Sequence, residues 1–158
     1  MNGGSLRASI NQIEVGTLQE VAGLWSFQYA AGWLADPLSF PLSPHLPLTT
    51  EPLLDGASKR PVQWYFGNLL PEEGQRVLLA GDAKLDAADA FGLLAWYGAE
   101  SAGSVTLLPP EAAPHMAEPL RPLPDDALEA RIRQLPKAPL THAAIKRMSL
   151  AGAQHKLA

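Results

Sequence analysis

The sequence contains no cysteine and no long apolar run. Because there are 0 cysteines in 158 residues, neither disulfide bonds nor thiolate metal ligands can form, and nothing requires an oxidising compartment. The longest apolar stretch, from about Phe91 to Ala99, falls short of the roughly 18 residues that a membrane-spanning helix needs. Residues 1–10 lack the basic and apolar segments of a secretion signal. We therefore expect a cytoplasmic protein with no membrane partner.

Charged residues are also scarce, at 18% of the chain, and they are unevenly placed. Residues 1–129 hold all 16 carboxylates against six basic side chains, a net charge of −10. Residues 130–158 hold six basic side chains and no acid, a net charge of +6. An acidic body disfavours direct DNA binding, because phosphate contacts dominate DNA affinity. The basic end suits phosphate or another anion, and a solvated surface without a ligand explains it equally well.

Glycine and proline are abundant instead, with 13 and 15 residues. This usage predicts short elements separated by many ordered turns and excludes a long coiled coil. The apolar fraction of 47% argues against wholesale disorder, and the length is sufficient for one hydrophobic core.

The first thirty residues alternate between apolar and other side chains as strands do. Turn signals at Asn11-Gln12 and Ala22-Gly23 divide the region, which predicts a three-stranded antiparallel meander. Its aromatic row is assigned to core packing, because a base-stacking platform would need more cations than the nearby Arg7. The alternating positions are Leu6, Ala8 and Ile10; Ile13, Val15 and Thr17; and Trp25, Phe27 and Tyr29.

The stretch from Pro37 to Pro61 is rich in proline and serine. Each proline removes a backbone donor, so we expect extended loops and edge-type strands there. Two interpretations remain open. The segment could serve as a polyproline ligand for a partner groove, or its interleaved leucines could dock on the protein's own core.

Proline, glycine and helix-capping residues predict helices farther along the chain. The first is expected from Pro71, limited by Gly74 or Gly81, and the second from a cap at Asp86 to a stop at Gly98.

A short strand is expected at Ser104–Leu108, followed by a linker. A third helix is expected to begin at Pro124 and to end before Pro136. Its apolar positions, which we expect to be buried, are Leu128, Ile132 and Leu135.

Most patterns of catalytic chemistry are missing. The four histidines, at positions 45, 115, 142 and 155, have no second ligand at metal spacing. No nucleophile-elbow pattern occurs. The small and basic residues of Ser149–Lys156 could form an anion-binding nest. The pattern alone favours a plain tail, because it lacks the Walker-A lysine followed by serine or threonine.

The order of several blocks resembles the HipA family, the kinase toxins of bacterial type II toxin–antitoxin modules. These blocks span nearly the whole chain. They are Phe27-Gln28-Tyr29 with Trp33-Leu34; Pro37-Leu38-Ser39 with Leu46-Pro47-Leu48; Phe66-Gly67-Asn68-Leu69-Leu70-Pro71-Glu72; Phe91-Gly92-Leu93-Leu94 with Gly98; Gly103-Ser104-Val105; and Ser149-Leu150-Ala151-Gly152-Ala153-Gln154-His155-Lys156.

The resemblance implies an α+β fold in three parts. Residues 1–108 would form a HipA-like N-terminal α+β subdomain, an antiparallel meander with packed helices. Residues 109–140 would form a Pro-rich linker and helix, and residues 141–158 the first strand and glycine-rich loop of a protein-kinase-like domain.

The same resemblance assigns roles to the end of the chain. Ser149 would be the autophosphorylation site, and its basic neighbours could hold the added phosphate. The implied nucleotide contacts in the glycine-rich loop are Ala151, Gly152, Ala153, Gln154, His155 and Lys156.

The expected function is therefore that of the N-terminal region of a HipA-like serine/threonine-protein kinase toxin. The family's catalytic aspartate, magnesium ligands and adenine-binding lysine lie farther along, so we expect this chain to be catalytically inert and to need no cofactor. ATP and Mg²⁺ would bind only in the full-length parent. The expected partners are a HipB-like antitoxin or the rest of the kinase domain. The alternative is a stand-alone, antitoxin-like regulator that binds a HipA-like kinase, although such proteins should stop before the glycine-rich loop.

Overall fold

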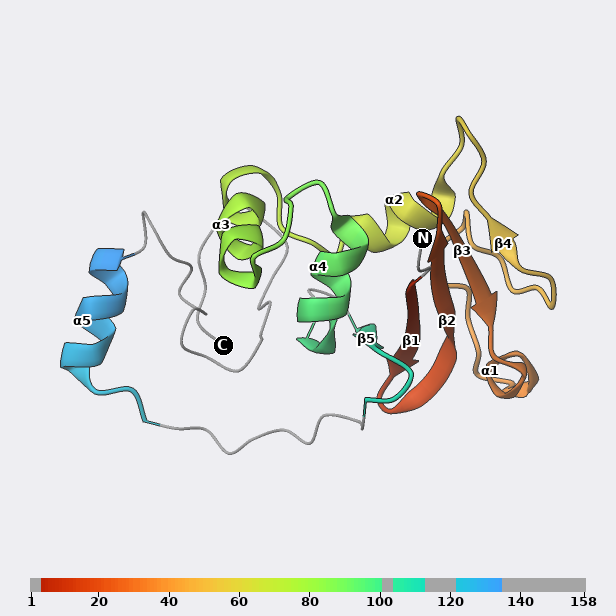
Figure 1. The fold of residues 1–158 in the computed structure, drawn as a ribbon. Helices are drawn as coiled ribbons and strands as arrows, with labels where there is room; N and C mark the ends of the chain where they lie inside the picture. The colour runs from red at the N-terminus through yellow and green to blue at the C-terminus, as the bar shows by residue number, and fades with distance from the viewer. Residues whose placement is uncertain (1–3, 101–103, 113–121, 135–158) are drawn as a thin grey trace.

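Five antiparallel strands in the order β4-β3-β2-β1-β5 form a single sheet at the centre of the fold (Figure 1). The computed structural model describes residues 4–100, 104–112 and 122–134. Helices between the strands complete an α+β fold, as the sequence predicts. The strands are β1 (Gly4–Ile10), β2 (Ile13–Val21), β3 (Leu24–Tyr29), β4 (Leu53–Leu54) and β5 (Thr106–Leu108). The helices are α1 (Ala31–Ala35), α2 (Pro61–Gly67), α3 (Glu73–Ala83), α4 (Ala90–Tyr97) with a 3₁₀ turn at Gly98–Glu100, and α5 (Asp125–Gln134).

Two tight turns join the first three strands, and both lie where the sequence predicts them. Asn11 and Gln12 have φ values of 50° and 68°, and Ala22 and Gly23 have values of 53° and 79°. Two consecutive residues with positive φ make a type I′ turn, whose twist matches that of the strands it connects. The predicted meander is therefore confirmed.

The alternation of β2 departs from the prediction at one residue. Ala8 pairs with Gly16, but Ser9 pairs with Glu14, so Val15 is an extra residue in β2. Such a bulge reverses which side of the sheet the following residues face. Thr17, which follows Val15 in the alternating row, is for this reason only half-buried, whereas Leu18 is fully buried.

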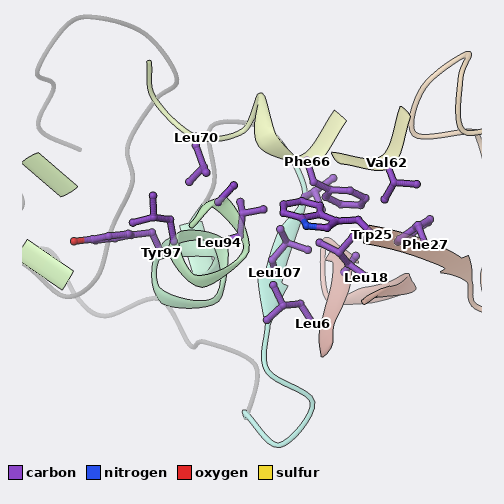
Figure 2. Close-up of a cluster of buried hydrophobic side chains, with 14 of the residues drawn as sticks. Leu6, Leu18, Trp25, Phe27, Val62, Phe66, Leu70, Leu94, Tyr97 and Leu107 are labelled. Atoms are coloured by element: carbon purple, nitrogen blue, oxygen red, sulfur yellow. The ribbon is translucent and has the colours of Figure 1, made fainter. Parts of the chain in front are cut away.

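The core lies between one face of the sheet and the helices α2 and α4. Trp25, Phe27 and Tyr29 are all buried, which confirms the packing role of the aromatic row. The ring of Phe27 lies 5.2 Å from that of Phe66 on α2, and Trp25 meets the edge of Phe91 on α4 at 5.4 Å between centroids. Figure 2 shows Trp25, Phe27 and Phe66 close together, among leucines of the sheet and of the helices.

Several boundaries of the predicted helices are wrong. α3 begins at Glu73 rather than at Pro71 and continues through both glycines expected to limit it. Asp86 does not cap α4. Its Oδ1 instead accepts a hydrogen bond from Ala88 N, 2.8 Å away, and Asp89 Oδ1 accepts one from Gly92 N at 2.8 Å. The helices α1 and α2 have no counterpart among the predictions.

β5 and α5 are of the types that the sequence predicts, but the side chains of α5 are less buried than expected. β5 is shorter than the expected strand and pairs antiparallel with β1. α5 begins at Asp125, close to the expected start. Ile132, however, is 52% exposed and Leu128 only half-buried, because no described element covers this helix. Leu135 lies outside the described residues. Within the described ranges, every helix is too short or too polar to cross a membrane.

Candidate functional site

The residues to which the sequence assigns chemistry lie at the end of the chain. Ser149 and the loop Ala151–Lys156 are outside the described ranges, as are the basic neighbours Lys146 and Arg147. Their assigned roles therefore stay predictions.

The described residues hold no group of three histidine, aspartate or glutamate side chains that could bind a metal ion. His45 is the one histidine in these ranges, and Asp55 is the one charged residue buried in them. Asp55 is engaged in the fold, because its Oδ1 and Oδ2 accept hydrogen bonds from Val62 N and Gln63 N at 2.9 and 3.0 Å. Asp55 therefore has a structural role at the start of α2.

Tyr97 on α4 forms the polar link between α4 and α3. Its hydroxyl donates toward Leu79 O and Asp82 Oδ2, each at 3.1 Å. In Figure 2 this ring points away from the sheet residues such as Leu6. Burial raises the pKa of the Tyr97 phenol, and the nearby Asp82 carboxylate raises it further. The neutral phenol thus joins α4 to α3 through its hydrogen bonds.

Tyr29 has the corresponding role at the other end of the core. Its hydroxyl donates to Leu46 O at 2.6 Å and accepts from Leu42 N at 2.9 Å. Burial raises the pKa of Tyr29, while the bond from Leu42 lowers it. Burial also raises the pKa of Tyr65, and the charge of Tyr29 raises it further. These contacts hold part of the proline-rich stretch against the sheet.

Residues 37–50, named here the Pro-Leu segment, contain no Asp, Glu, Lys or Arg. The segment has a buried side and an exposed side. Leu46 is fully buried, while Leu38 is 83% exposed, Phe40 47% and Leu48 38%. Leu46 thus docks on the core, as one of the two interpretations of the sequence predicts. The other interpretation, a polyproline ligand for a partner groove, stays a prediction.

The exposed part of the Pro-Leu segment has a fixed backbone. Asp36 Oδ1 accepts a hydrogen bond from Leu38 N at 2.8 Å, and Asp36 O accepts one from Ser39 N at 3.0 Å. The indole of Trp33 donates to Phe40 O at 3.2 Å, and the two rings meet edge to face. The exposed Leu38 therefore lies in an ordered turn, and the buried Trp33 holds the residues that follow it.

The block from Phe66 to Glu72, which contributes to the family resemblance, serves the packing of the helices. Phe66, Leu70 and Pro71 are buried, and Asn68 ends α2. The chain thereby turns from α2 into α3 with its apolar side chains in the core. These residues position the scaffold.

The packing of the fold also explains why residue 98 is a glycine. A Cβ on Gly98 would lie 2.7 Å from Leu107 Cβ and 3.0 Å from Leu107 O. Only glycine lets the end of α4 approach β5 this closely. Arg7 holds the chain that follows β5, because its guanidinium donates a hydrogen bond to Ala112 O at 2.8 Å.

A hollow of about 330 Å³ lies along α5. Arg133 and Glu129 form an ion pair on its wall, and both side chains are largely exposed to solvent. An exposed pair of this kind is a weak basis for a ligand site. The hollow is lined by Asp126, Glu129, Ala130, Arg133 and Gln134.

Comparison with known proteins connects this fold with one family. The family model described as HipA N-terminal domain matches residues 6–108. A Sinorhizobium fredii (strain NBRC 101917 / NGR234) protein named "Putative kinase Y4mE" is 40% identical over 145 residues, which cover 88% of this chain and 34% of that protein.

A solved structure shares the fold. It is the Shewanella oneidensis MR-1 toxin–antitoxin system HipA, HipB and its operator DNA complex, with a TM-score of 0.62 and 25% sequence identity. The match covers 81% of this chain and 29% of that chain. The chain thus spans about a third of the length of these two relatives.

Proposed function

Because the chain belongs to the HipA N-terminal domain family, we propose that it works as the N-terminal region of a HipA-like serine/threonine kinase toxin of a toxin–antitoxin system. The observation that carries this proposal is the 40% identity, over 88% of the chain, to a protein named as a kinase. The family match over residues 6–108 agrees with it. The described residues supply a packed scaffold rather than reacting groups.

We further propose that the chain by itself is catalytically inert. Phosphoryl transfer requires groups that position the phosphates and metal ions that stabilise their charge. The described ranges contain no metal-ligand cluster, and their buried tyrosines are engaged in the fold. ATP and Mg²⁺ would bind only to a protein that also carries the remainder of a kinase-like domain, and the loop Ala151–Lys156 would be this chain's contribution.

Ser149 is proposed as the residue that such a kinase would phosphorylate on itself. It stands between Lys146 and Arg147 on one side and Lys156 on the other, with no carboxylate among residues 130–158. A phosphate adds about −1.5 to −2 charge at pH 7, which these cations would stabilise. Mass spectrometry of an active parent kinase tests this assignment, and a phosphate located elsewhere would reject it.

The partner proposed for the chain is a HipB-like antitoxin, since the related Shewanella HipA forms a complex with HipB and operator DNA. Direct DNA contact is not proposed for residues 4–112, because their net charge of −7 opposes phosphate. A cytoplasmic location accords with this role.

Calorimetric titration with ATP and Mg²⁺ tests the proposed function. The 158-residue chain is compared with a chain extended through a kinase-like domain, if its source DNA encodes one after these residues. We expect binding only by the extended chain. ATP binding by the short chain would reject its inertness. If no kinase-like sequence follows and the short chain inhibits a HipA-like kinase in trans, the alternative role as a regulator would replace the proposal.

A further inference from the structure

The Pro-Leu segment has two properties of a protein-docking surface. It exposes Leu38, Phe40 and Leu48. It has no charged residue over its 14 positions. Charge depletion together with exposed aromatic and apolar side chains is the composition that distinguishes the centre of an interface from the remaining surface. In Figure 1 the connection between α1 and β4 lies on the β3–β4 side of the sheet, away from α3.

The backbone of this surface is already in place before a partner binds. Tyr29 holds Leu42 and Leu46, and the Trp33 indole holds Phe40 O at 3.2 Å. A side chain on a fixed turn loses little conformational freedom on binding, so more of its apolar contact appears as affinity. Because Leu38 makes no contribution to the core at 83% exposure, the fold itself gives no reason for a leucine there.

Charge at the two ends of the segment indicates the kind of partner. Asp36 precedes the segment and Glu51 follows it, so an uncharged apolar surface is bracketed by two carboxylates. The surrounding body, residues 4–112, carries a net charge of −7. The complementary surface is an apolar hollow with lysine or arginine at its rim, and a protein that binds DNA carries such cations in excess.

We infer that the Pro-Leu segment is the surface on which a basic, operator-binding antitoxin of the HipB kind docks. Leu38 and Leu48 enter the partner's apolar hollow, and Asp36 and Glu51 face cations at its rim. The inference rests on the proposed function and adds to it the residues of contact. A second copy of this chain fits less well, because it would bring a second acidic body to the same place.

The test is a binding titration with a basic, operator-binding antitoxin of the HipB kind from the source genome, if it encodes one. The variant is Leu38→Ser with Leu48→Ser, and the matched control is Leu54→Ser, an exposed leucine (69%) on β4 outside the segment. We expect the double variant to bind at least about tenfold more weakly, as centrally placed anchors do, and the control to bind within about twofold of the unaltered chain. Equal urea midpoints for all three chains exclude loss of folding.

A second pair of variants tests the charges. Asp36→Asn keeps an oxygen for the hydrogen bond from Leu38 N, and Glu51→Gln keeps the side-chain shape. We expect the two together to weaken binding several-fold at low salt and to make it less salt-dependent, since rim charges act mainly through steering.

Three results would overturn the inference. Unchanged binding by the Leu38→Ser, Leu48→Ser variant would place the antitoxin elsewhere and leave the proposed function standing. Absence of binding by the unaltered chain would reject both the docking surface and the antitoxin as partner, while the ATP titration still decides the kinase assignment. Self-association that the same variant abolishes would identify a second copy as the occupant.

Discussion

The carboxylate of Asp55 caps α2 from outside the helix, with Oδ1 2.9 Å from the backbone nitrogen of Val62. The residue next to the helix, Arg60, provides no side-chain cap. Asp55 N donates to Trp25 O at 2.9 Å as well. One residue therefore joins β3 to the start of the helix that covers it.

Replacing Asp55 by Ala is expected to destabilise the fold by about 1–3 kcal/mol, because two backbone donors at a helix start lose their acceptor. Urea denaturation at pH 7 measures the change. Glu51→Ala, at an exposed position four residues earlier, is the control and should stay within about 0.5 kcal/mol of the unaltered chain. Equal stabilities of the two variants would contradict the capping role.

Gly98→Ala is expected to destabilise the protein by about 1–3 kcal/mol, because the added methyl overlaps Leu107 and forces α4 away from β5. Gly81→Ala is the matched control, since a Cβ on Gly81 meets nothing within 4 Å and the residue lies inside α3. Alanine there should stabilise the helix by up to about 1 kcal/mol. Thermal and urea unfolding should shift in opposite directions for the two variants.

Tyr97→Phe is expected to cost about 0.5–1.5 kcal/mol at neutral pH through loss of its hydrogen bonds to Leu79 O and Asp82. The pKa of Tyr97 is raised above the ordinary value of 10.0, so the unfolded chain releases this proton at lower pH than the folded one. The associated stability is complete below pH 10 and declines as the pH rises through the folded-state pKa. Unfolding between about pH 9 and 11 should therefore depend less steeply on pH in the variant. The same slope in both proteins would show that Tyr97 ionises freely when folded.

The turn at Ala22-Gly23 offers a stabilising change. Ala22 has a φ of 53°. Asparagine adopts this left-handed backbone conformation more readily than alanine does. Ala22→Asn creates the Asn-Gly pair that type I′ turns prefer, and we expect a gain of about 0.5–1 kcal/mol. Gly23→Ala, at a φ of 79°, should instead destabilise by about 1–2 kcal/mol. Urea midpoints that move together would contradict this account of the turn.

Local signals were sufficient where neighbouring residues in the sequence decide the structure. The turns at Asn11-Gln12 and Ala22-Gly23 and the aromatic row of β3 could be read directly, because strand alternation and turn chemistry are short-range properties. The start of α5 at Asp125 follows from its own first turn in the same way. Its burial did not follow, because burial depends on which other element covers a helix.

Other features depend on residues far apart in the chain. The bulge at Val15 exists only in the pairing of β2 with β1, so alternation along the sequence could not show it. The cap of α2 comes from Asp55 rather than from the preceding residue, and the helix was missed. Asp86 and Asp89 are both capping residues by type, and only the packing of α4 selects the second.

The candidate sites show the same division. The assignment of Ser149 and Ala151–Lys156 came from their pattern and from family resemblance, and these residues lie outside the described ranges. The Pro-Leu segment could be found by its composition, since residues 37–50 carry no acidic or basic side chain. Composition could not show which of its leucines would face solvent, because that depends on the hydroxyl of Tyr29 and the indole of Trp33.

The sequence by itself determined the α+β class, the meander and the kinship with HipA. Strand alternation, turn residues and the order of the HipA-like sequence blocks are all local properties of the chain. The tertiary structure decided that β5 closes the sheet beside β1, that Leu46 is buried while Leu38 is exposed, and that Asp55 caps a helix that begins six residues later. These outcomes depend on contacts across the core, where packing selects among conformations that local propensity leaves nearly equal in free energy.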